Sequence, residues 1–259
     1  MERRQFILYT LATGLQMTGH PGAQPVRNAT GAIRGCTAAD SKLSPEHSGP
    51  VTLFLCGDVM TGRGIDQVLP HPGNPRLYEE YIGNAGGYVE LAEEANGPIP
   101  KPVSFSYIWG DSLAELERMK PDVRIINLET AVTRSDDAED KPVNYRMNPD
   151  NIPCITAANI DCCILANNHV LDWGYRGLDE TLSTLQKAEI KTAGAGCHIG
   201  QARAPAVMTI PNKGRVLVFS YGSETSGIPS NWAATGTDRA TTRTTTRKLM
   251  VRLIHRSRN

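Results

Sequence analysis

The sequence has little that would mark a membrane or nucleic-acid-binding protein. Its 27 basic and 27 acidic residues cancel, so no net field draws the chain toward an anionic partner. No apolar run approaches the length that a bilayer requires, which is about 20 residues for a helix. We therefore expect no nucleic-acid partner, and the sequence leaves association with a membrane open.

Cysteine-based metal and redox motifs are also absent. None of the six cysteines has the C-x-x-C spacing of zinc ribbons or thioredoxin-like sites. Cys56, Cys162 and Cys163 lie in apolar runs, which predicts buried, reduced thiols. Adjacent Cys162 and Cys163 would point to opposite faces of a strand. Reduced thiols slightly favour the cytoplasm, whereas Arg3-Arg4 before an apolar stretch resembles a short export signal, so the location stays open.

The composition changes along the chain and predicts three segments. Residues 1–49 are rich in Gly, Pro, Ser and Thr without steady periodicity, so we expect a mostly disordered leader. Residues 50–235 carry regular apolar patterns and form the predicted domain. Residues 236–259 hold seven basic side chains against one acidic one. We expect this low-complexity tail to be poorly ordered, with at most a short helix near 249–254, and dispensable for the fold.

Strand and helix patterns alternate within the predicted domain. Apolar runs predict strands at 51–56, 123–128 and 162–166, and a hairpin at 206–220. Helical patterns occur near 88–94, after Asp111, after Asn148-Pro149 and across 178–185. This alternation is typical of an α/β fold with a largely parallel sheet and right-handed crossovers.

Polar side chains follow the predicted strands at their carboxyl ends. Asp58, Glu129, Asn168 and His169 all take such positions, where ligands bind in parallel sheets. Carboxylate, amide and imidazole ligands suit Mn, Zn, Mg or Fe without selecting one. Each residue also has an ordinary structural interpretation, since Asp58 could end a strand, Glu129 could cap a helix and His169 could be a core histidine. The shared position of the set favours a site.

Four ordered motifs carry a family resemblance across residues 51–235. They are Gly57-Asp58-Val59-Met60-Thr61-Gly62-Arg63, Asn127-Leu128-Glu129-Thr130, Ala166-Asn167-Asn168-His169-x-x-Asp172-x-Gly174 and Gly194-Ala195-Gly196. Together they resemble the CapA family of poly-γ-glutamate capsule synthesis proteins, in the calcineurin-like metallophosphatase superfamily. The Asn-Asn-His element is the most specific of the four.

The resemblance implies an α/β/β/α sandwich of two facing sheets and a role for each motif residue. Asp58 would bind a metal ion, Glu129 would bridge two ions and Asn168 would bind the second. His169 would act as general acid or hold the leaving oxygen, and Asp172 would fix the loop or orient His169. The superfamily places a histidine two residues after the first aspartate, where this chain has Met60.

The resemblance stops near residue 235. The family's His-Trp-Gly and Gly-His-x-x-His segments do not follow, and we interpret the basic tail as an altered reading frame or truncation that leaves the fold incomplete at its C-terminus. We therefore expect a capsule biosynthesis protein with an impaired metal-dependent hydrolase site for an anionic polymer or phosphoester. The alternatives are a non-catalytic binding or assembly component and, from the basic tail, a nucleic-acid-binding protein.

Overall fold

A computed structural model describes residues 49–234, 240–241 and 248–254, so the predicted leader lies outside the described residues. The helices are α1 (Arg63–Val68), α2 (Gly86–Asn96), α3 (Ser112–Met119), α4 (Pro153–Thr156), α5 (Gly174–Lys187) and α6 (Ile199–Arg203), with short 3-10 turns at Tyr107–Trp109, Pro149–Asn151, Glu224–Ser226 and Ser230–Trp232. The strands are β1 (Leu53–Val59), β2 (Val123–Leu128), β3 (Ala131–Val132), β4 (Arg146–Met147), β5 (Cys162–Ile164), β6 (Lys191–Ala193), β7 (Ala195–Gly196), β8 (Ala206–Ile210), β9 (Gly214–Tyr221), β10 (Ala240–Thr241) and β11 (Lys248–Ile254). None of the helices in this described part is both long and apolar enough to cross a bilayer.

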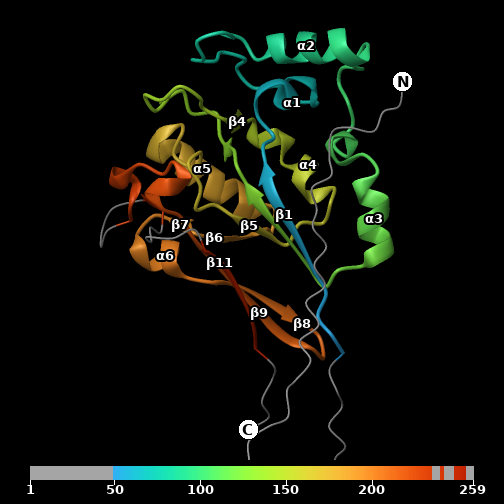
Figure 1. Ribbon diagram of the computed structural model, residues 1–259, viewed down its shortest axis with the longest axis vertical. Coiled ribbons are helices and arrows are strands. Elements are labelled where there is room, and N and C mark those ends of the chain that lie inside the picture. Colours follow the sequence, from blue (N-terminus) through green and yellow to red (C-terminus); the bar gives the residue numbers. More distant parts are fainter. Residues whose placement is uncertain (1–48, 235–239, 242–247, 255–259) are drawn as a thin grey trace, which may run out of the picture. The chain divides into compact units, whose positions relative to one another are not determined.

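The central element is a four-stranded parallel sheet in the order β1-β2-β5-β6. The predicted strands that lead to Asp58, Glu129 and Asn168 belong to it, which confirms the α/β class and the parallel arrangement. Figure 1 shows β1 running toward α1, so the carboxyl ends of the strands face the α1–α2 lobe. A register shift at Cys56/Asp58 interrupts the pairing of β1 with β2 just before the strand ends.

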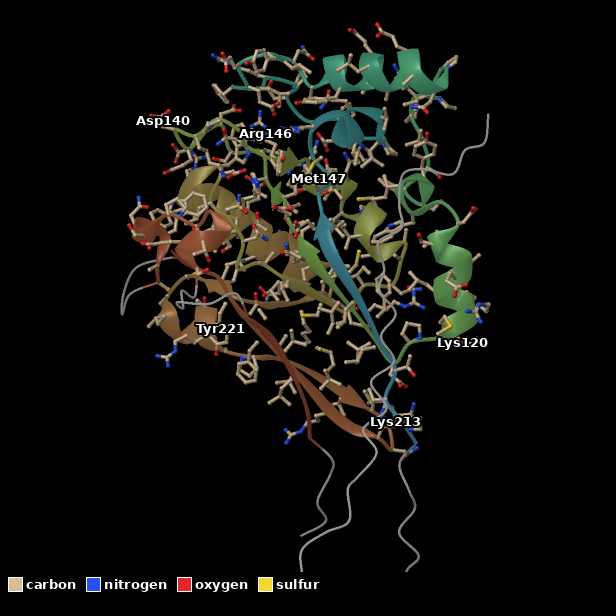
Figure 2. The ribbon with its side chains drawn as sticks, viewed as in Figure 1. Lys120, Asp140, Arg146, Met147, Lys213 and Tyr221 are labelled. Atoms are coloured by element: carbon tan, nitrogen blue, oxygen red, sulfur yellow. The ribbon has the colours of Figure 1, made fainter. Side chains whose placement is uncertain are left out.

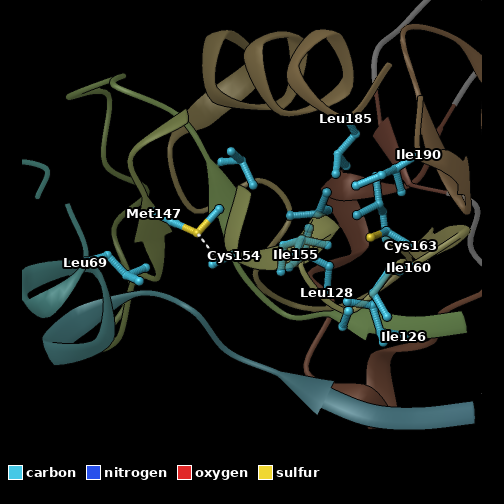
Figure 3. Packing of buried hydrophobic residues seen from close by; sticks show 14 of the residues in the cluster. Leu69, Ile126, Leu128, Met147, Cys154, Ile155, Ile160, Cys163, Leu185 and Ile190 are labelled. Carbon is cyan, nitrogen blue, oxygen red and sulfur yellow. Dashed lines mark hydrogen bonds between the residues drawn. The ribbon is translucent and has the colours of Figure 1, made fainter. Parts of the chain in front are cut away.

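Each face of this sheet packs into a separate hydrophobic core. Ile126 of β2 and Cys163 of β5 belong to the larger core, which contains residues of α3 and the residues of α4 and α5 that Figure 3 shows. Ile125 and Cys162, their neighbours in sequence, belong to a smaller core on the opposite face. Side chains alternate along a strand, so the prediction that Cys162 and Cys163 point to opposite faces is confirmed.

The second sheet covers the smaller core. It is antiparallel in the order β11-β9-β8, and the β8–β9 hairpin was predicted from the sequence. Met208 of β8 and Val218 of β9 belong to this core together with Ile125 of β2. Val207, which points the other way, is 40% exposed. The described residues thus give a helix layer, a parallel sheet and an antiparallel sheet.

The tail prediction is wrong for residues 248–254. They form β11, which pairs with β9 through seven residues from Lys248 opposite Tyr221 to Ile254 opposite Arg215. Residues 240–241 form β10 and pair with β7, and the rest of the tail lies outside the described residues. The sequence Leu-Met-Val-Arg-Leu-Ile has β-branched residues that favour strands, and β9 offers an otherwise open edge. Tertiary pairing therefore decides against the expected helix.

Two predicted helix starts have different outcomes. Asn148 caps the turn at Pro149–Asn151 as expected, because its side chain accepts a hydrogen bond from the Asp150 amide. Asp111 occupies the N-cap position of α3, but its side chain makes no capping hydrogen bond. Asp111 has helical backbone angles, whereas a capping side chain usually belongs to an extended residue.

Candidate functional site at the strand ends

Three polar side chains join the ends of β1, β2 and β5. Asn127 Nδ2 donates to Asp58 Oδ1 at 2.6 Å, and Asn167 Nδ2 donates to Asn127 Oδ1 at 3.0 Å. Asn167 also donates to the Leu128 carbonyl at 2.9 Å. Its own Oδ1 accepts from the His169 amide at 3.0 Å, which places His169 at the same rim as Asp58.

His169 is held by Asp172, three residues later. Its Nδ1 lies 2.7 Å from Asp172 Oδ2, and the Asp172 side chain is completely buried. A carboxylate accepts hydrogen bonds only, so the pair fixes the histidine proton on Nδ1. Nε2 is then directed at the rim, where it lies 3.8 Å from Glu129 Oε1. The predicted contact of Asp172 with His169 is thus present.

Asp172 is also the anchor for a segment that sequence reasoning missed, residues 139–145. Lys141 Nζ donates to Asp172 Oδ1 at 2.7 Å, and the Tyr145 amide donates to Oδ2 at 2.6 Å. The Asp172 carbonyl accepts from the Glu139 amide at 2.9 Å and from Asn144 Nδ2 at 3.1 Å. Five hydrogen bonds therefore converge on one residue, counting the bond to His169, and Asp172 orders the loop as well as the imidazole.

Asn168 takes part through its backbone and through close packing. Its carbonyl accepts a short hydrogen bond from Lys141 Nζ. Its side chain lies against Gly227, where a methyl group would come within 3.4 Å of Asn168 Nδ2. Gly227 has φ +76°, a left-handed conformation that favours glycine. The turn at Glu224–Ser226 therefore ends at a glycine that packs against the Asn168 side chain.

An aromatic and cationic stack continues from the histidine. The Tyr145 ring stacks on His169 with centroids 3.9 Å apart, and the Arg63 guanidinium carbon lies 4.7 Å from the same Tyr145 ring. Burial raises the pKa of the Tyr145 hydroxyl, and the positive charge of Arg63 opposes that rise. Arg63 belongs to the first sequence motif, and Tyr145 has no motif that could have identified it.

The described side chains do not form a closed metal shell. No group of three or more His, Cys, Asp or Glu residues within the described ranges is arranged to hold an ion. Glu129 and His169 converge at 3.8 Å, whereas the Asp58 carboxylate is engaged by Asn127. Two ions need more donors than this rim brings together, so the residues described do not fit a two-ion centre.

The carboxyl ends of the parallel strands therefore bring all five predicted site residues to one rim, namely Asp58, Glu129, Asn168, His169 and Asp172. Direct contacts join His169 with Asp172 and bring it close to Glu129, and Asp58 is connected to them through Asn127 and Asn167. The functional roles assigned to these residues stay predictions. Asn127 and Asn167 were within the quoted motifs without a role, and the signal that could have found them was their position beside the candidate ligands.

A comparison with known families matches residues 52–259, which include all of this rim, to the family described as bacterial capsule synthesis protein PGA_cap. The chain belongs to this family. Its match includes residues 248–254, which form β11.

Curated relatives extend the comparison. The chain is 51% identical over 185 residues to a probable polyglutamine synthesis accessory protein of Mycobacterium tuberculosis, covering 71% of this chain and 49% of the relative. It is 24% identical over 149 residues to the PGA biosynthesis protein CapA of Bacillus subtilis, covering 57% of this chain and 30% of that protein. For the capsule biosynthesis protein CapA of Bacillus anthracis the identity is 21% over 160 residues, covering 62% and 32%. The chain thus spans about half the length of the Mycobacterium relative.

Proposed function

We propose that this PGA_cap chain is an accessory protein of bacterial capsule synthesis that binds a poly-γ-glutamate polymer at the strand-end rim. The names of the relatives support a role in polymer synthesis. The observation that carries the site is the buried Asp172 carboxylate, which fixes His169 from behind and leaves Nε2 directed at the rim. A rigid acceptor of this kind costs little conformational entropy when a ligand binds.

The chemistry of the rim fits an amide polymer. In the tautomer with its proton on Nδ1, the His169 ring offers Nε2 as a hydrogen-bond acceptor for a backbone amide N–H of the polymer. Glu129 is 17% exposed at the same point and offers a second acceptor. Both rim carboxylates, Asp58 and Glu129, repel the free carboxylates of the polymer, so these must be directed away from the rim.

Binding of purified protein to defined polymers tests the proposal. We expect the chain to bind poly-γ-glutamate more tightly than hyaluronate or polyphosphate, and His169→Ala to weaken that binding. His198→Ala is the matched control, since His198 caps α6 through a hydrogen bond to the Gly200 amide and its loss should leave binding unchanged. Equal binding of all three polymers would show that the rim does not recognise an amide backbone.

A metal-dependent hydrolase is the second candidate, favoured by the His169–Asp172 pair. Such a pair can transfer a proton at Nε2, because Asp172 stabilises the protonated ring. We propose that this chain alone hydrolyses poorly, since the described donors do not complete a two-ion shell. Mn, Zn, Fe and Mg content, measured together with turnover of γ-glutamyl peptides and phosphodiesters, tests this. Two tightly bound ions with rapid turnover would contradict it.

A further inference from the structure

A groove of about 240 Å³ opens between α1 and α2, next to the rim. Its walls are mostly apolar and include Ile65, Val68, Val89 and Ile99. Met60 lines it as well, two residues beyond Asp58. Sites for drug-sized ligands measure roughly 300–1,000 Å³, so this groove suits a smaller unit. In Figure 1 the two helices form a lobe beyond the carboxyl end of β1.

Arg63 lies at the wall of this groove in a conformation fixed from both sides. Its φ is +50°, which non-glycine residues rarely adopt. Gly62 and Gly64 on either side allow tight packing. A methyl group at Gly62 would lie 2.7 Å from the Arg146 carbonyl oxygen, and one at Gly64 would lie 3.1 Å from Tyr88 Cβ. Strained backbone that is over-determined in this way is common at ligand sites.

The guanidinium group is positioned as firmly as the backbone. Its carbon lies 4.7 Å from the ring centroids of both Tyr88 and Tyr145. Its Nε donates to Glu79 Oε1 at 2.7 Å, and Glu79 also accepts a short hydrogen bond from the Tyr88 hydroxyl. The guanidinium group is therefore preorganised, and little conformational entropy would be lost when it binds an anion.

The terminal nitrogens of Arg63 remain available. Within residues 49–234, the hydrogen bond that the Arg63 side chain makes is donated by its Nε atom. The side chain is 18% exposed. A guanidinium has five N–H donors in a planar fork that matches a carboxylate. Tyr145 connects this fork to the proposed site, since the same ring contacts His169.

We propose that Arg63 and the groove form a subsite for one γ-linked glutamyl unit. The guanidinium pairs with the free carboxylate of the unit, and its methylene groups lie against the apolar walls. The inference rests on the proposed function, because it takes the polymer as the ligand. The subsite also explains how an anionic polymer can bind beside Asp58 and Glu129. The polymer carboxylates that these residues repel pair with Arg63, on the other side of Tyr145.

Calorimetric titration with a γ-glutamyl trimer tests the subsite. We expect the wild-type chain to bind the trimer, Arg63→Gln to bind it at least tenfold more weakly, and a trimer with amidated carboxylates to bind as weakly as that variant. Ala92→Trp, which adds a bulky side chain to the α2 wall of the groove, should also reduce affinity at least tenfold. Arg76→Gln is the control, since Arg76 lies 5.1 Å from the Tyr78 ring and does not line the groove.

Circular dichroism establishes whether each variant is folded. If Arg63→Gln is not folded, the affinity of Ala92→Trp for the trimer decides whether the subsite exists. No binding of the trimer to the wild-type chain would overturn the subsite. Binding that neither variant changes would also overturn it. If long poly-γ-glutamate still binds in that case and depends on His169, the proposed function stands without the subsite. Failure of the long polymer to bind would contradict the proposed function itself.

Discussion

Replacing Asp172 by asparagine should destabilise the protein by about 3–5 kcal/mol, the usual cost of removing one partner of a buried ion pair. Asp172 Oδ1 accepts from Lys141 and Oδ2 accepts from Tyr145 and His169, all at 2.6–2.7 Å. An asparagine of the same shape must direct its NH₂ group at one of these donors. Whichever orientation it takes, a donor faces a donor at a completely buried position, and at least one charge-assisted bond is lost.

Urea unfolding at pH 7, followed by tryptophan fluorescence, measures this loss. Trp109, Trp173 and Trp232 are all buried, so unfolding exposes every tryptophan of the chain. Asp150→Asn is the matched control because Asp150 pairs with Arg134 at the surface, where side chains are 58% and 52% exposed. Exposed pairs contribute about 0–1 kcal/mol. If Asp172→Asn lost no more free energy of unfolding than Asp150→Asn, Asp172 would not be the structural anchor described here.

Three further predictions concern other parts of the chain. Removing residues 248–259 should lower the free energy of unfolding by more than about 1 kcal/mol and the melting temperature by roughly 3 °C or more, because β11 pairs with β9 over seven residues. An unchanged melting temperature would show that this pairing does not stabilise the fold. The hydrogen bond from Lys213 holds the pKa of Asp122 below its ordinary value of 3.8, so the pair stabilises the fold above that value and its contribution is lost as the pH falls through the lowered pKa. Lys213→Met should therefore cost up to about 1 kcal/mol at pH 7 and less once the pH falls below the lowered pKa of Asp122, and a cost that does not change with pH would contradict the ion pair. Burial raises the pKa of Cys154 and of Cys162 to about 12, so both thiols should resist thiol reagents at pH 8 until denaturant is added, as mass spectrometry of the modified peptides would show.

The parallel sheet was predictable because its strands carry their own signal. Val123–Leu128 was predicted with the boundaries that the structure gives, since its four buried apolar residues give a strong strand signal that ends at polar residues. The strand-end rule then placed Asp58, Glu129 and His169 at one rim without any knowledge of side-chain contacts. Lys213, which joins the hairpin turn to Asp122, lies low in the view of Figure 2, whereas Arg146 lies high in it.

The segment that supports His169 could not be predicted in the same way. Residues 131–147 form only the two-residue strands β3 and β4, too short to give a periodic pattern. Lys141 and Tyr145 reach Asp172 across 31 and 27 residues, and such contacts are determined by the tertiary fold. The strand β11 was missed for a related reason, because its own composition allows a helix or a strand and its pairing with β9 decides between them.

The two unequal cores have a consequence for synthesis on the ribosome. The apolar face formed by Val123, Ile125, Cys162 and Ala193 is complete once residue 193 has emerged, but its cover comes from Ala206–Ile210 and Gly214–Tyr221. At translation rates of about 5–20 residues per second, the nascent sheet has one bare face for seconds before the hairpin can fold back. Chaperones that bind exposed apolar strands should therefore engage this protein at that stage, and slowing translation between residues 193 and 221 should increase its aggregation.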